Sequence, residues 1–148
     1  KSIPHLTIFK IRCCSESKCC SCWTEIEDDW TSIYVNAAGN GSKWLNATGW
    51  SVFTCSGQTE SDRLAECLCE SAIKNFPGRR IRTDMSDGDM DWEEGFYILR
   101  KSWCPAVLTE NFFMDSKSNL AYLQSVEGKR AIVTTHVEGV VEWITTKC

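Results

Sequence analysis

The sequence predicts an α/β domain in which a mixed, largely parallel sheet is flanked by helices. Three observations support this class. Short β-branched and aromatic runs alternate with helical patterns, the most apolar runs have the length of interior strands, and turn-forming residues separate the segments. A length of 148 residues suits one domain with one hydrophobic core. We therefore expect one layered domain, preceded by a segment of different character.

That segment comprises residues 1–30, and residues 31–148 form the predicted α/β domain. Residues 7–11 have the composition of a short strand, but the acidic run 25–29 follows without clear periodicity. Five of the ten cysteines cluster here: Cys13, Cys14, Cys19, Cys20 and Cys22. The cluster could bind a soft metal, act as a redox site, form disulfides or remain as free thiols, because the separated ligand pairs of a zinc ribbon are absent.

The elements of the first half are expected in the following order. Residues 32–35 are β-branched and aromatic, which predicts a strand, and the small residues 36–42 predict a loop after it. Residues 49–54 alternate apolar and small polar side chains, as a half-buried strand does. Thr59 then begins a helix that ends at the Pro77-Gly78 pair.

The second half continues the alternation. Residues 83–94 are acidic and rich in turn formers, and we expect a solvated loop because their spacing is not that of an EF-hand. Residues 96–99 and 106–108 are short apolar runs typical of interior strands. Asp115 or Ser116 is expected to cap a helix, and a final helix is expected after Gly128.

Glu110 is the first candidate for chemistry. It follows the apolar run 106–108 and Thr109, at the end of a predicted buried strand. A desolvated carboxylate costs several kcal/mol unless it is paired or bound to a metal. The alternative is that Glu110 only accepts hydrogen bonds at the strand end.

Composition excludes two classes of partner. A net charge of −4 argues against nucleic acid, since affinity for phosphate backbones comes largely from clustered Lys and Arg. No apolar run approaches the roughly 18 residues needed to span a bilayer, so no transmembrane segment is predicted. We therefore expect neither a nucleic-acid-binding nor a membrane-spanning protein.

Several motifs in order resemble one family. SIYVNAAGNG from Ser32, CPAVLTENFF from Cys104 and the last helix resemble the C-terminal two-thirds of the zinc-dependent N-acetylmuramoyl-L-alanine amidases of the Amidase_3 type. The resemblance does not extend to residues 1–30. It implies an amidase-like fold that is incomplete at its N-terminus, and hydrolysis of the amide between the lactyl group of N-acetylmuramic acid and L-alanine. It also implies peptidoglycan or muropeptide as partner, a location in the cell envelope or outside the cell, zinc as cofactor, and Glu110 as the proton-handling carboxylate.

The chain departs from the family at the metal ligands. Tyr34 stands where the family has the histidine of Ser-Ile-His, and no Gly-His-Gly turn is present. His5 and His136 are the available imidazoles, and we interpret His136 as an ordinary helix position. The Tyr34 phenolate is therefore the candidate metal ligand at this position, and it would need partners.

Three functional hypotheses follow. The first is an active amidase whose N-terminal region supplies ligands. The second is a truncated, degenerate scaffold that binds muropeptide without cleaving it, with Asn36, Gly39 and Asn40 as expected substrate-binding residues. Trp44 and Trp50 could line that groove, although packing in the core is the simpler explanation of their indoles. The third hypothesis is a soft-metal or redox protein acting through the cysteine cluster. If residues 1–30 do not replace the missing strands, exposed sheet surface predicts self-association.

Overall fold

A computed structural model describes residues 7–12, 30–38 and 43–146 of the chain. The elements are β1 (Thr7–Arg12), β2 (Trp30–Ala38), β3 (Trp50–Thr54), α1 (Glu60–Asn75), β4 (Trp92–Glu93), α2 (Tyr97–Arg100), β5 (Ala106–Phe113), α3 (Lys117–Gln124) and α4 (Val126–Thr146). The cysteine cluster, the acidic run 25–29, Gly39 and Asn40 lie outside the described residues. Within the described ranges, every helix is too short or too polar to cross a membrane.

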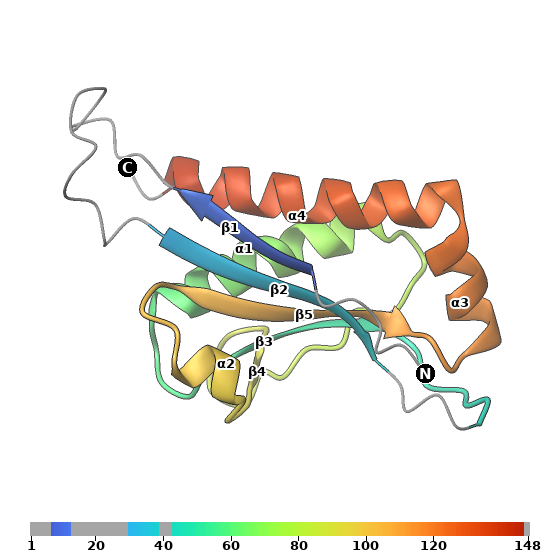
Figure 1. Cartoon of the computed structure of the whole chain (residues 1–148), viewed down its shortest axis with the longest axis horizontal. Coiled ribbons are helices and arrows are strands. Elements are labelled where there is room, and N and C mark those ends of the chain that lie inside the picture. Colours follow the sequence, from blue (N-terminus) through green and yellow to red (C-terminus); the bar gives the residue numbers. More distant parts are fainter. Residues whose placement is uncertain (1–6, 13–29, 39–42, 147–148) are drawn as a thin grey trace.

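The five strands form one sheet in the order β1-β2-β5-β3-β4 (Figure 1). Strand β2 runs parallel to β5, and β3 runs parallel to β4. The pairings of β1 with β2 and of β3 with β5 are antiparallel. The predicted mixed α/β class is confirmed, with antiparallel pairing as frequent as parallel pairing. Strand β1 comes from the segment 1–30 and pairs along β2, while the domain boundary at residue 30 stays a prediction.

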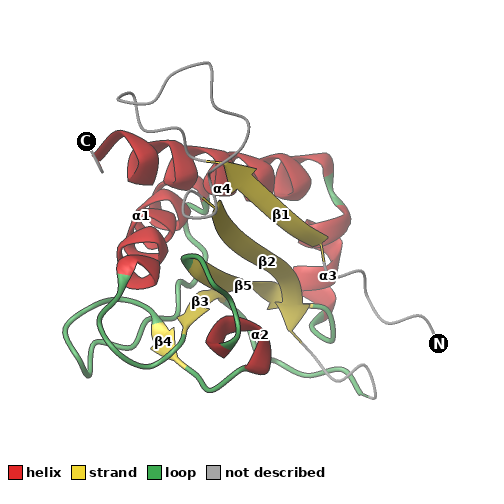
Figure 2. Cartoon of the chain, turned by 60° about the vertical axis from the view of Figure 1, so that its left-hand side comes forward, coloured by secondary structure: helices red, strands yellow, loops and turns green. Residues whose placement is uncertain are grey.

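Two long helices cover one face of the sheet, and the short α2 lies at the other face (Figure 2). Helix α1 packs Leu64, Leu68 and Ala72 into the main core, where Trp50, Val52 and Val107 come from the strands. Helix α4 approaches α1 closely at Gly139, where the absence of a side chain permits the contact. A Cβ at that residue would lie 3.0 Å from the Leu68 Cα. This core fixes the orientation of β3 and β5, the strands that carry the site described below.

The boundaries of α1 are as predicted. The Thr59 hydroxyl accepts a hydrogen bond from the Ser61 amide at 3.1 Å, and the Asp62 carboxylate accepts one from the Thr59 amide, which completes a capping box. The helix ends immediately before Phe76, Pro77 and Gly78. The local signals were sufficient here because each bond joins residues that are close in sequence.

Four expectations about elements were wrong. Residues 36–38 belong to β2 rather than to a loop, because β5 continues far enough to pair with Ala38. Residues 97–99 of the predicted strand 96–99 lie in α2, because the Leu99 and Arg100 amides both donate to the Phe96 carbonyl oxygen and close a helical turn. The last helix begins at Val126, before Gly128, where a Cβ would meet the Tyr122 carbonyl oxygen at 2.0 Å. The fourth error concerns the acidic loop and is treated with the site.

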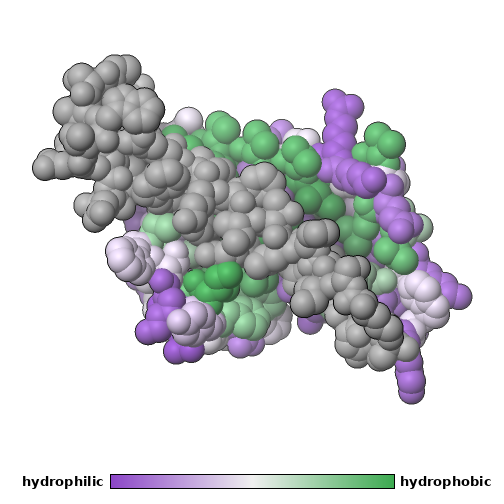
Figure 3. All heavy atoms as spheres, in the orientation of Figure 1, coloured by the Kyte–Doolittle hydropathy of each residue, from purple (hydrophilic) through white to green (hydrophobic). Residues whose placement is uncertain are grey.

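Three exposed valines on α4 stand at four-residue spacing. They are Val133, Val137 and Val141. Hydrophobic side chains gather over this helix in Figure 3. Four-residue spacing places side chains in one row on a helix, so the row is continuous. Self-association of the chain nevertheless stays a prediction.

Candidate active site around Glu110

Glu110 lies on β5, between β2 and β3 in the sheet. Its neighbours in register are Asn36 on the parallel strand β2 and Ser51 on the antiparallel strand β3. The side chain is half-buried, and its Oε2 atom is shielded from solvent. The sheet therefore holds this carboxylate on a strand that is paired along both edges.

A β-bulge follows Glu110 directly. The register with β2 passes from Asn36 opposite Glu110 to Ala38 opposite Phe113, so β5 has one residue more than its partner in this interval. Phe112 lies in the bulge and has a φ of +63°, in the left-handed region that bulky side chains rarely adopt. Bulges and such strained residues are concentrated next to active sites, where they redirect side chains.

Polar contacts on the core face hold β5 on both sides of Glu110. Thr109 Oγ1 lies 2.9 Å from His136 Nε2, and the other ring nitrogen, Nδ1, lies 2.7 Å from the Ile132 carbonyl oxygen. The Trp50 indole N–H donates to Asn111 Oδ1 at 2.9 Å. His136 is thus a buried histidine in a helix, with both ring nitrogens occupied. Trp50 is a core residue, which favours the simpler of the two interpretations of its indole.

His136 makes stability depend on pH. Burial lowers the pKa of His136 from its ordinary value of 6.5, and the hydrogen bond to the Ile132 carbonyl partly opposes this. The unfolded chain therefore binds a proton before the folded chain does as pH falls. Stability should be complete above pH 6.5 and should fall on acidification below it, by at most about 1.4 kcal/mol per pH unit for one proton.

Urea unfolding of the wild type and of His136→Gln between pH 5 and pH 8 measures this effect. Gln keeps a polar side chain beside Thr109 but does not titrate. The difference between the two profiles isolates His136 from the other titrating groups. Parallel profiles across this range would contradict the assignment.

The other predicted site residues divide into three groups. Asn36 lies beside Glu110 in register, and Tyr34 lies beside Leu108, two residues before Asn36 on β2. Gly39 and Asn40 are outside the described residues. Trp44 is exposed, and Lys117 Nζ lies 5.6 Å from the centre of its ring.

The described residues do not fit a catalytic zinc beside Glu110. Such a site needs three side-chain ligands and an open position. In the described ranges, the one group of three or more His, Cys, Asp or Glu side chains close enough to hold an ion consists of Asp62, Asp89 and Asp91. Glu110 does not belong to it, and His136 uses its ring nitrogens on the core face.

Sequence reasoning missed this acidic group. It treated residues 83–94 as a solvated loop, which is right for the exposed Asp87 and wrong for the buried Asp89 and Asp91. Burial raises the pKa of Asp91 to about 7, the hydrogen bond from Thr54 opposes the rise, and the nearby Asp89 and Asp62 charges add to it. The spacing Asp-x-Asp directly before Trp92 was the available signal, but it does not show burial.

Comparison with known proteins identifies one family. A family model described as N-acetylmuramoyl-L-alanine amidase (Amidase_3) matches residues 23–142. The match begins within the segment 1–30, which the resemblance in the sequence did not cover. No curated protein matches the chain significantly.

Solved structures of amidases have a similar fold. N-acetylmuramoyl-L-alanine amidase from Clostridium difficile 630 is 25% identical with a TM-score of 0.62, over 80% of this chain and 58% of that one. The amidase AmiC2 of Nostoc punctiforme is 23% identical with a TM-score of 0.60, over 78% of this chain and 57% of that one. Cwp6 from Clostridium difficile is 26% identical with a TM-score of 0.51, over 76% of this chain and 17% of that one. The chain thus spans less than two-thirds of these proteins.

Proposed function

Because the chain belongs to the N-acetylmuramoyl-L-alanine amidase family, we propose that it is a peptidoglycan hydrolase domain. Its substrate would be the amide that joins the lactyl group of N-acetylmuramic acid to L-alanine. The observation that carries the proposal is the position of Glu110. The matched region contains it, and the sheet holds it beside Asn36 at the start of a bulge.

Glu110 is the proposed general base and acid. Its carboxylate accepts a proton from a water molecule as the water oxygen adds to the amide carbonyl carbon. The same proton then passes to the leaving nitrogen as the C–N bond breaks. The products are a lactyl carboxylate and a free amino group on L-alanine. No step is assigned to zinc, because the described residues do not fit it.

Substrate binding is assigned to the edge of the sheet beyond Glu110. Asn36 is adjacent in register, and Gly39 and Asn40 follow it in the chain. Trp44 is held near the end of β5, because the Leu45 amide donates to the Asp115 carbonyl oxygen at 2.7 Å. An exposed indole at this place offers an apolar surface for a sugar ring or a peptide. A cell-envelope or extracellular location is the corresponding proposal.

Incubating the purified full chain with defined muropeptides tests the proposal. Mass spectrometry should detect free stem peptide beginning at L-alanine, together with the lactyl acid. Binding of intact muropeptide by isothermal titration, without any product in the presence or absence of added Zn²⁺, would replace hydrolysis by the degenerate, binding-only function.

Metal analysis tests the candidate ligand Tyr34. Zinc content should be the same in the wild type and in Tyr34→Phe, because the sequence has no Gly-His-Gly turn to supply the family's second histidine ligand. Plasma mass spectrometry of the two proteins, and of a variant with Cys13, Cys14, Cys19, Cys20 and Cys22 changed to Ser, measures this. Zinc lost only with Tyr34→Phe would restore the phenolate as a ligand. Zinc lost only with the cysteines would favour the soft-metal alternative.

A further inference from the structure

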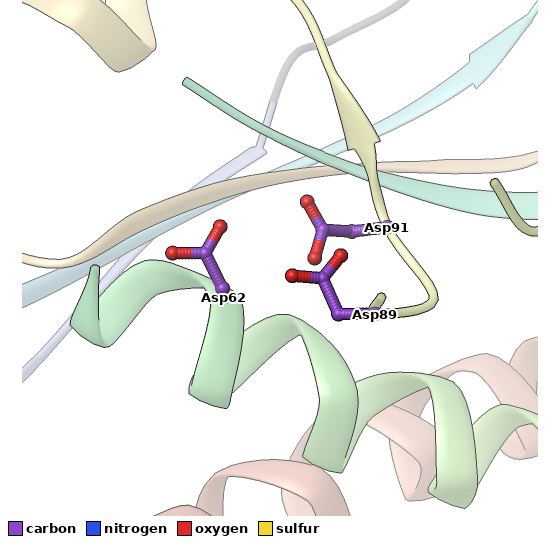
Figure 4. Close-up of side chains that lie close together, drawn as sticks. All are labelled: Asp62, Asp89 and Asp91. Carbon is purple, nitrogen blue, oxygen red and sulfur yellow. The ribbon is translucent and has the colours of Figure 1, made fainter. Parts of the chain in front are cut away.

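Three carboxylates meet at one place between α1 and the loop that precedes β4 (Figure 4). Asp62 comes from the first turn of α1, and Asp89 and Asp91 come from the loop. One oxygen from each lies within 4.8 Å of the others. Figure 4 shows the three side chains directed toward one another. We call this group the aspartate triad.

The triad is buried. Asp62 is 5% exposed, Asp89 is 7% exposed and Asp91 is 1% exposed. One oxygen of each is fixed by a neutral donor. The Thr59 amide donates to Asp62, Gln58 Nε2 donates to Asp89 Oδ2 at 2.9 Å, and Thr54 Oγ1 donates to Asp91 Oδ2 at 2.5 Å. These donors orient the carboxylates without neutralising them.

The second oxygen of each carboxylate lacks a hydrogen-bond partner among the described residues, which indicates that a ligand is missing. Oδ1 of all three residues is shielded from solvent and has no hydrogen-bond partner in the part of the chain that the structure describes. The ion pair formed among the described residues joins Lys74 to Glu138. No described lysine or arginine therefore forms an ion pair with the triad. Buried polar atoms are almost always satisfied, and buried charges are paired or bound to a metal.

A proton shared between two of the carboxylates would neutralise only part of the negative charge of the triad. The carboxyl groups of Asp89 and Asp91 can hydrogen-bond to each other when one of them is protonated. Such a proton neutralises one of three charges and leaves two carboxylates in a site with no cationic side chain. A divalent cation in place of this proton would offset two of the three negative charges, with one oxygen of each carboxylate as a ligand.

We propose that the aspartate triad binds one hard divalent cation, of the Ca²⁺ or Mg²⁺ class. Oxygen-only ligand sets suit these ions, whereas zinc prefers nitrogen and sulfur. Ca²⁺ takes oxygen ligands at about 2.3–2.6 Å, so ligands on opposite sides of it are separated by about 5 Å, as the triad allows. The ion ties the loop before β4 to the start of α1 and, through Thr54, to the end of β3.

The cation site is independent of the proposed hydrolysis. Thr54, which holds Asp91, lies three residues beyond Ser51, the register partner of Glu110 on β3. The triad residues are not neighbours of Glu110 in the sheet. The ion therefore has a structural role, and its binding is measurable on protein that has no substrate.

Terbium luminescence tests binding directly. Tb³⁺ replaces Ca²⁺ in oxygen sites and emits when a nearby indole is excited, and Trp92 directly follows Asp91. Titration of the EDTA-treated full chain should give saturable emission at one ion per chain, which CaCl₂ or MgCl₂ displaces. Asp89→Asn should lose this emission, and Asp87→Asn, an exposed acid of the same loop, should keep it. Emission that is absent in the wild type, or that is equal in both variants and the wild type, would overturn the proposal.

Thermal unfolding provides a second readout. The order of stability of the wild type and Asp89→Asn should reverse when the ion is added. At 100-fold excess over its dissociation constant, the ion should raise the Tm of the wild type by roughly 5–10 °C. In EDTA, Asp89→Asn should be at least as stable as the wild type, because it removes one buried negative charge. With CaCl₂ the wild type should become the more stable protein. If Asp89→Asn does not fold, the wild-type shift and the terbium titration decide the question, and a wild-type Tm that is the same in EDTA, CaCl₂ and MgCl₂ contradicts the site.

Discussion

Hydrolysis of muropeptide is expected to fall by at least about 100-fold when Glu110 is changed to Gln, the loss typical of removing a general base. Gln has nearly the same shape, so the pairing of β5 with β2 and β3 should persist. It cannot accept the proton of the attacking water. The measurement is the initial rate of stem-peptide release by the purified full chain, followed by mass spectrometry.

Two controls make this result specific to Glu110. Glu127→Gln changes an exposed acid of α4 and should keep the wild-type rate. Affinity for intact muropeptide should be similar in all three proteins, because the change removes a proton acceptor and not a binding surface. Full activity of Glu110→Gln would exclude the proposed role.

Replacement of Phe112 should cause a large loss of stability. The residue is fully buried, and its ring centroid lies 5.1 Å from that of Phe76 and 5.4 Å from that of Tyr122. Phe112→Ala should lower the free energy of unfolding by about 3–5 kcal/mol, from lost burial and the cavity that remains. Denaturant unfolding measures the loss.

Phe112→Gly should be more stable than Phe112→Ala by about 1 kcal/mol. Both variants lose the ring, but only glycine tolerates a φ of +63° without steric cost. At an ordinary strand position the order is the reverse, because glycine loses more conformational entropy on folding. Val52 on β3 provides the matched control, and Val52→Ala should be more stable than Val52→Gly. The same order at both positions would show that the bulge is not strained.

The candidate site was predictable only in part. Glu110 could be selected as a candidate because its strand, its neighbouring proline and its apolar run lie within one short segment. The bulge at Phe112 could not, since it results from the register between β5 and β2, which are distant in sequence. The acidic loop shows the same limit. Asp87 and Asp89 are two residues apart and both flank Gly88, yet Asp87 is exposed and Asp89 is buried against α1.

The sequence by itself determined the elements that depend on short-range interactions. The capping box at Thr59, the end of α1 before Pro77 and the apolar core of β5 follow from bonds and periodicity within a few residues. The tertiary structure alone decided the direction in which strands pair, the helical form of residues 97–100, the strain at Phe112 and the meeting of Asp62 with Asp89 and Asp91. These features depend on which distant segments bury one another, and burial sets the environment in which a carboxylate must find a partner.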